Sequence, residues 1–152
     1  MYEALLIYVG LGTLAYLYLK YKKKVGQELI IALLISIAWV SISGLYNYKN
    51  GNIFIFGINV FPVIMWTMSG VLLREIYERV TWKNKFFYIT LFCIFIVTFI
   101  EYIGYNILDI QTVSTFKGLM GIEAMHMPWW GKLYYLVIGP IYLKITDYMN
   151  VR

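Results

Sequence analysis

One apolar segment carries side chains whose types and spacing could support proton chemistry inside a membrane. Intervals of three, four and four residues separate the members of this stripe, which are Thr98, Glu101, Tyr105 and Asp109. On a helix this spacing places the four side chains on one face. A carboxylate costs about 2.5–3.5 kcal/mol at the centre of a membrane helix, so we expect Glu101 to face other helices or a wet cavity. Glu101 is therefore a candidate general acid, proton carrier or cation ligand.

The only histidine of the sequence lies in the segment that follows the stripe. Glu123 and His126 form a Glu-x-x-His pair, whose side chains share a face if this segment is an interfacial helix. Di-iron bundles use this spacing, but they need two such pairs and two further glutamates, so we expect no metal and no cofactor. The candidate catalytic residues are Glu101, Asp109 and His126. The structural alternative has Glu101 contacting lipid headgroups, with His126 bonded to Glu101, Asp109 or the backbone.

A second polar stripe precedes the first by about 60 residues. It has the same three intervals and consists of Ser36, Trp39, Ser43 and Asn47. Small and hydroxyl side chains let membrane helices approach closely and hydrogen-bond across the contact, so helix packing is the ordinary explanation. The functional alternative is a ligand groove between this stripe and the one that holds Thr98 and Tyr105.

The composition decides which elements must position these residues. Of the 152 residues, 61% are hydrophobic and only 14% are charged, with a mean hydropathy of +0.69. A soluble domain of this length has too little interior for so much apolar surface. Cys93 is the only cysteine, which excludes an internal disulfide. The net charge of +5 comes from basic residues that flank apolar runs, which favours membrane lipids rather than nucleic acid as partners.

The apolar runs predict an all-α, polytopic membrane bundle that forms a single domain. A hydrocarbon core of about 30 Å needs about 20 helical residues. We predict about five spans and an outer interfacial segment near 109–127; the spans are residues 2–20, 29–47, 60–78, 86–108 and 128–148. Pro62 and Pro128 suit the first turns of their helices, and Pro140 predicts a kink. In the alternative with four spans, the last segment is re-entrant.

The basic residues predict the orientation in the membrane. With five spans and the N-terminus outside, ten of the 13 lysines and arginines lie on the inner side, as the positive-inside rule requires. This arrangement predicts a protein of the plasma membrane with a cytoplasmic C-terminus. Residues 53–58 would then lie along the outer interface, and the mixed-charge run 74–79 would form a solvated cap at the inner one.

Three functions remain open at this stage. The first is a non-enzymatic subunit or lipid-binding component of a membrane assembly, with lipids, other membrane subunits or a second copy of the chain as partners. The second is a membrane enzyme acting on an apolar lipid or isoprenoid, which requires a lipid-sized pocket with Glu101 on its wall as the acid. The third is a small transporter or channel, which is favoured only by Pro140 and the short last segment.

Overall fold

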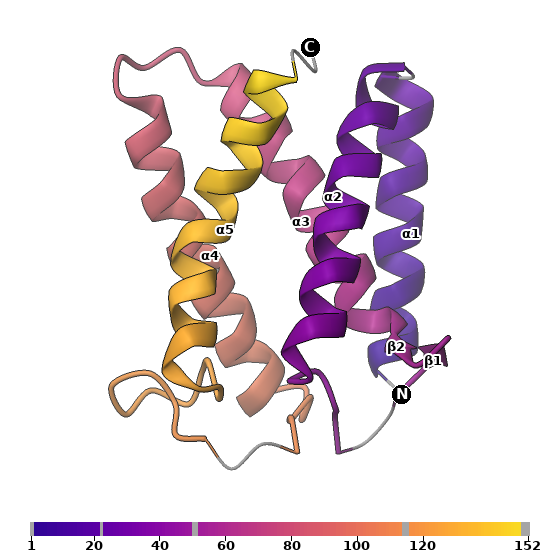
Figure 1. The fold of residues 1–152 in the computed structure, drawn as a ribbon, viewed down its shortest axis with the longest axis vertical. Coiled ribbons are helices and arrows are strands. Elements are labelled where there is room, and N and C mark those ends of the chain that lie inside the picture. The colour runs from indigo at the N-terminus through magenta and orange to yellow at the C-terminus, as the bar shows by residue number, and fades with distance from the viewer. Residues whose placement is uncertain (1, 22, 50–51, 114–115, 150–152) are drawn as a thin grey trace.

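The computed structural model describes residues 2–21, 23–49, 52–113 and 116–149. Within these residues the protein is all-helical apart from one short hairpin, as predicted, with 72% of residues in helices (Figure 1). The elements are α1 (Tyr2–Tyr21), α2 (Lys23–Ser43), β1 (Phe54–Ile55), β2 (Ile58–Asn59), α3 (Val60–Arg79), α4 (Lys85–Asn106) and α5 (Trp129–Tyr148). Successive helices run in opposite directions, so residues 44–49, 52–59, 107–113 and 116–128 lie at one end of the bundle, called here the hairpin end.

Local sequence signals explain where the helices begin and end. Asn59 caps α3 by accepting the N–H of Phe61 at 3.2 Å, and Pro62 occupies the first turn as predicted. Helix α2 begins six residues earlier than its predicted span, at Lys23, and ends earlier, at Ser43. It ends there because Gly44 has a φ of +59°, a conformation that glycine adopts without strain. Asn47 therefore lies in a loop and not on the helical stripe to which the sequence pattern assigned it.

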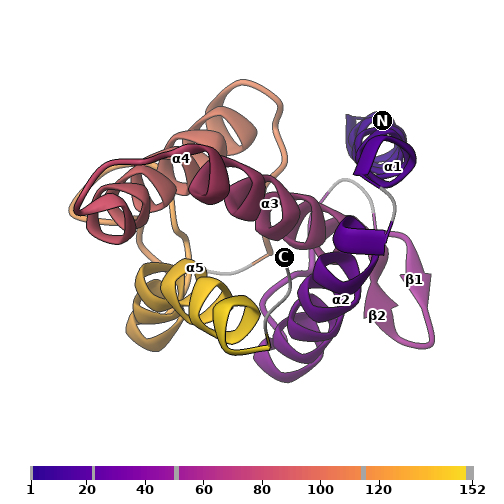
Figure 2. The same cartoon turned by 90° about the horizontal axis from the view of Figure 1, so that it is seen from above.

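Four helices surround the interior, and the first lies outside them. Seen from above, α2, α3, α4 and α5 are arranged around a centre, while α1 packs against α2 and α3 (Figure 2). Gly10 permits the contact of α1 with α3, because a Cβ there would come within 2.7 Å of side-chain atoms of Ile64 and Met65. The largest cluster of buried side chains joins all five helices and includes Val25, Val71 and Leu143.

Four helices have the length and composition of membrane spans. They are α1, α2 from Val25 onward, α3 and α4. Helix α5 is long enough to cross a membrane, since it also has 20 residues, but it contains Lys132, Lys144 and Asp147 and does not satisfy the same hydropathy criterion. It nevertheless runs along the bundle beside α4 and returns the chain to the end opposite the hairpin (Figure 1).

Two expectations from the sequence need correction. The segment between α4 and α5 contains no helix among its described residues, so the Glu123–His126 pair does not lie on an interfacial helix. Turns and isolated bridges form this segment instead, with positive φ angles at Asp109, Met120 and Met125. The run 74–79 is not a solvated cap throughout, because Arg74 and Glu75 are buried against the other helices.

Candidate functional site

Glu101 lies in the second-last turn of α4 with its carboxylate directed into the bundle. The backbone N–H of Met125 donates a hydrogen bond to Oε2 at 2.7 Å, and the hydroxyl of Tyr135 on α5 interacts electrostatically with the carboxylate. Both partners are buried. Glu101 therefore connects α4 to α5 and to the loop between them.

The contacts of Tyr135 extend into a polar network. Its hydroxyl oxygen lies 3.1 Å from that of Tyr46, in the loop that follows α2. The indole N–H groups of Trp39 and Trp66 both donate to the Tyr46 oxygen, at 2.6 and 2.9 Å. We call Glu101, Tyr135, Tyr46, Trp39 and Trp66 the Glu101 network. It joins α2, α3, α4 and α5 at the hairpin end.

The two indole groups fix the direction of the hydrogen bond between Tyr46 and Tyr135. An indole nitrogen can only donate, so Trp39 and Trp66 occupy both lone pairs of the Tyr46 oxygen. Tyr46 must then donate its own proton to Tyr135, which leaves the Tyr135 proton free to point toward the nearby Glu101 carboxylate. Burial raises the pKa of Tyr46 above its ordinary value, which keeps this hydroxyl neutral. An ionised carboxylate can only accept hydrogen bonds. The Glu101 carboxylate is therefore the end point of this series of donors.

The surrounding structure holds these side chains in place. Asn59, the cap of α3, donates its amide N–H to the carbonyl oxygen of Tyr46 at 3.0 Å. Trp39 stacks on Tyr134, with ring centroids 3.4 Å apart and an interplanar angle of 4°. The Trp66 ring contacts the Tyr135 ring edge-on, with centroids 4.8 Å apart. The network is therefore enclosed by aromatic rings.

The other two candidate catalytic residues have different partners. Nε2 of His126 lies 2.8 Å from Oε2 of Glu123, and its ring stacks on Tyr105 with centroids 3.8 Å apart. Asp109 is exposed just after α4, in the left-handed conformation with a φ of +52°. The structure thus brings Glu101 together with tyrosines and tryptophans that the sequence analysis did not link to it, while His126 pairs with the exposed Glu123.

The hydroxyl groups of the two predicted stripes bond mainly to their own helices. Ser36 donates to the carbonyl oxygen of Ala32 at 2.7 Å, and Thr98 donates to that of Ile94 at 2.8 Å. Ser43 makes a longer bond, of 3.5 Å, to Val40. Of the second stripe, Trp39 alone joins the Glu101 network. Ser36 has a second role, since its side chain lines a cavity.

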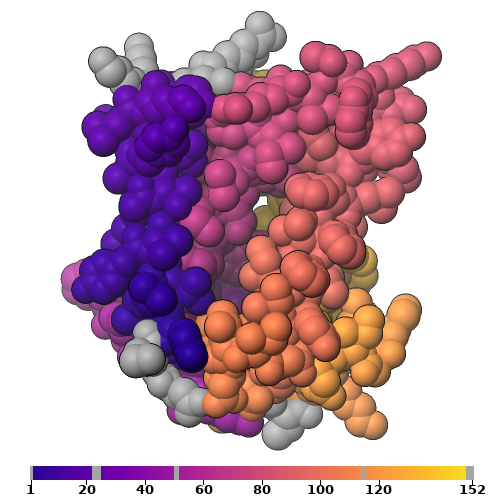
Figure 3. Space-filling model, turned by 180° about the vertical axis from the view of Figure 1, so that it is seen from behind, coloured from indigo at the N-terminus to yellow at the C-terminus, as the bar shows by residue number. Residues whose placement is uncertain are grey.

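This cavity lies between α2, α3, α4 and α5 and has a volume of about 40 Å³. Its walls are mostly apolar and include small residues from each of these helices, among them Ser36, Ser69, Gly70, Cys93 and Gly139. Trp66 and Tyr134 also line it, so it adjoins the Glu101 network. From behind, the surface is hollowed between α3 and α4, and part of α5 is visible through the opening (Figure 3).

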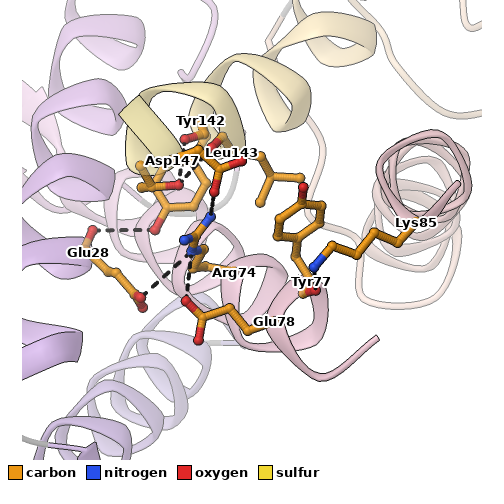
Figure 4. Close-up of polar contacts among 9 residues, drawn as sticks. Glu28, Arg74, Tyr77, Glu78, Lys85, Tyr142, Leu143 and Asp147 are labelled. Atoms are coloured by element: carbon orange, nitrogen blue, oxygen red, sulfur yellow. Dashed lines mark hydrogen bonds and ion pairs between the residues drawn. The ribbon is translucent and has the colours of Figure 1, made fainter. Parts of the chain in front are cut away.

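A second polar cluster lies at the opposite end of the bundle (Figure 4). Arg74 on α3 donates through Nη1 to Asp147 on α5 at 2.5 Å, and through Nε to Glu78 at 3.1 Å. Its Nε also lies 3.9 Å from an oxygen of Glu28 on α2, whose side chain is fully buried. The hydroxyl of Tyr142 donates to the Glu28 carbonyl oxygen at 3.4 Å. Arg74 therefore links three helices at this end.

Sequence reasoning missed most residues of both clusters. Glu28 marked only the border of an apolar run, and Tyr46 and Tyr135 were two among 15 tyrosines. The one available signal was Arg74, because it interrupts an apolar helix before its end and must find partners inside the bundle. Among the described residues, no group of three or more histidine, cysteine or acidic side chains is placed to hold a metal ion.

Comparisons of the chain with protein-family models, with curated proteins and with solved structures find no match. The argument for a function therefore comes from the geometry of this chain.

Proposed function

We propose that the protein is a non-enzymatic component of a membrane that holds a lipid or isoprenoid chain between α2, α3, α4 and α5. The observation that carries this proposal is the apolar cavity among these helices, together with the opening between α3 and α4 (Figure 3). If both helices span the membrane, this opening faces the acyl chains of the bilayer. A lipid chain could then enter the interior sideways without crossing a headgroup layer.

The loose packing of α4 supports this proposal. Only 6% of the most apolar stretch of α4 is buried, against 44% for α3, and Ile89 is its one fully buried residue. No hydrophobic driving force holds a helix against its neighbours inside a bilayer, so such a helix depends on van der Waals packing and a few polar contacts. A volume of about 40 Å³ holds little more than one water molecule. Binding of a whole chain therefore requires α4 to move outward.

Polar contacts at the two ends of α4 would control this movement. At one end Glu101 accepts the N–H of Met125 and interacts electrostatically with Tyr135, and at the other Nζ of Lys85 donates to the carbonyl oxygen of Tyr77 at 3.2 Å. We infer that these ends stay attached while the middle of α4 separates from α3. We infer that Glu101 is a positioning residue, because its hydrogen bond to Met125 and its interaction with Tyr135 are both made within the protein. The enzyme hypothesis needs Glu101 on the wall of the pocket, and the cavity is lined by Trp66 and Tyr134 instead.

The same proposal includes the arrangement in the membrane. We propose that α5 is a fifth span and that the hairpin end faces outside, with the C-terminus in the cytoplasm of a plasma-membrane protein. The alternating helix directions support this orientation, because they bring the basic stretches near residues 20, 79, 83 and 144 to one end. Other membrane subunits or a second copy of the chain remain candidates for the partner that the exposed face of α4 contacts.

A pair of variants of α4 tests the proposed ligand site. Val97 lines the cavity, so Val97→Trp is expected to fill it, whereas Ile100→Trp adds the same ring on the exposed face, where Ile100 is 57% exposed. The natural chain and both variants are purified and taken through exhaustive detergent exchange. Mass spectrometry of the lipid extracts then measures the amount of bound lipid per amount of protein.

We expect the natural chain and Ile100→Trp to retain about one apolar molecule per protein, and Val97→Trp to lose most of it. Equal retention by all three proteins would show that the cavity is not the binding site. Size-exclusion elution and the unfolding temperature confirm that both variants fold.

A further inference from the structure

The turn of the hairpin carries a residue that the backbone geometry disfavours. Ile55 pairs with Ile58, so Phe56 and Gly57 form a two-residue connection, and both have positive φ angles, of +49° and +78°. This is a type I′ turn, in which the first position favours Asn, Asp or Gly because a bulky side chain is strained there. Phenylalanine at this position makes the hairpin less stable than asparagine would. A favourable interaction of the side chain outside the hairpin must therefore offset the strain.

The side chain of Phe56 does not pack into the protein interior. It is 99% exposed, and its neighbours in the hairpin, Phe54 and Ile55, are 53% and 56% exposed. Ile55 and Ile58 form one face of the hairpin, and the other face carries Phe54 opposite Asn59, whose polar side chain is buried and hydrogen-bonded to Tyr46 and Asn52. In addition, the sequence contains no charged residue between Lys49 and Arg74. Such a hairpin lacks the polar face that a strand pair in contact with water normally shows.

The hairpin is attached directly to the start of α3. Its base is closed by the N–H of Val60, which donates to the carbonyl oxygen of Ile53 at 2.8 Å, and β2 continues directly into α3. The hairpin projects sideways from the bundle, near the start of α1 and at the level where α3 begins (Figures 1 and 2). If α3 spans the membrane, this level is the boundary between headgroups and acyl chains.

We propose that the β1–β2 hairpin is a membrane anchor that inserts Phe54 and Phe56 into the acyl region of the outer leaflet, beside the helices. A bilayer can surround the exposed strand β1 and the turn, while β2 packs toward the bundle, where Ile58 is half-buried and Asn59 is buried. A protein partner would instead cover one face or pair with an edge, and strands of two residues offer little edge for pairing. The inference rests on the membrane-spanning arrangement of α3, but it does not depend on a ligand in the cavity.

Spin labels at single cysteines measure the depth of the hairpin directly. In a Cys93→Ser background, Phe56→Cys and Phe54→Cys are labelled in phosphatidylcholine vesicles, and collision rates with oxygen and with a water-soluble nickel complex are compared. Lys83→Cys, in the exposed turn between α3 and α4, is the control from the opposite end of the protein.

We expect both hairpin labels to collide with oxygen at least threefold more effectively, relative to the nickel complex, than the label at position 83. A ratio at positions 54 and 56 equal to that at position 83 would place the hairpin in water and overturn the anchor. Low collision rates with both reagents would also overturn it, in favour of a protein contact. Because two positions are labelled, loss of one variant on folding leaves the other as a test, and either failure leaves the proposed cavity ligand unaffected.

Discussion

The hydroxyl oxygens of Tyr46 and Tyr135 lie 3.1 Å apart, although 89 residues separate them in the sequence. The contact matters because Tyr46 already accepts two indole N–H groups, which forces its proton toward Tyr135 and leaves the Tyr135 proton free to point toward Glu101. The hydrogen bond between the two tyrosines can therefore form in only one direction within the Glu101 network. We infer that it fixes the relative positions of α2, α3, α4 and α5 at the hairpin end, and thereby one end of the cavity.

The hydroxyl of Tyr46 is the centre of this arrangement. Tyr46→Phe leaves the partly buried N–H groups of Trp39 and Trp66 without their acceptor, and each such loss costs about 1–3 kcal/mol. We expect the variant to lower the free energy of unfolding by about 2–4 kcal/mol. Denaturant titration in detergent micelles, followed by tryptophan fluorescence, measures this change. Tyr148→Phe is the matched control, because Tyr148 is exposed and the same substitution there should change stability by less than about 0.5 kcal/mol. Equal effects of the two variants would argue against the network.

Arg74 is expected to be the most sensitive residue at the opposite end. Arg74→Met removes the cation shared by Glu28, Glu78 and Asp147, and it leaves the fully buried Glu28 carboxylate with less compensation. The expected loss of stability is about 3 kcal/mol, the lower part of the range for breaking buried pairs, because Asp147 is partly exposed. Arg79→Met is the control, since Arg79 is largely exposed and its pair with Glu75 should be worth less than about 1 kcal/mol.

The result that would count against this role is a loss of less than 1 kcal/mol for Arg74→Met, in the same unfolding titration.

The position of the C-terminus decides whether α5 is a fifth span. In a Cys93→Ser background, Met149→Cys and Lys83→Cys should react with a membrane-impermeant maleimide only after the cytoplasmic side is made accessible. Lys117→Cys should react in intact cells, because residue 117 belongs to the segment between α4 and α5, which joins these helices at the hairpin end. Labelling of Met149→Cys in intact cells together with Lys117→Cys would establish the four-span alternative and remove the proposed orientation.

The helices could be predicted from the sequence because their signals are local. Apolar runs bounded by charged residues, and the Asn59–Pro62 start of α3, fix elements without reference to the rest of the chain. The Glu101 network could not be predicted in this way. Its partners come from a loop and three helices, and nothing in the spacing of Tyr46 and Tyr135 distinguishes them from the other tyrosines. The loop after α4 was misjudged for a related reason: its form depends on contacts such as that of the Met125 N–H with Glu101, which only the folded bundle supplies.

The most direct test of the central claim uses the one cysteine of the natural sequence. Cys93 lines the cavity, so a bound lipid or isoprenoid chain should shield its thiol from a small apolar maleimide. The alkylation rate is measured in native membranes, after removal of lipid by detergent exchange, and after return of a total lipid extract. The account predicts at least a fivefold faster reaction after lipid removal and a return to the slow rate when lipid is restored. An alkylation rate that is the same in all three states would contradict a ligand-holding cavity between α2, α3, α4 and α5.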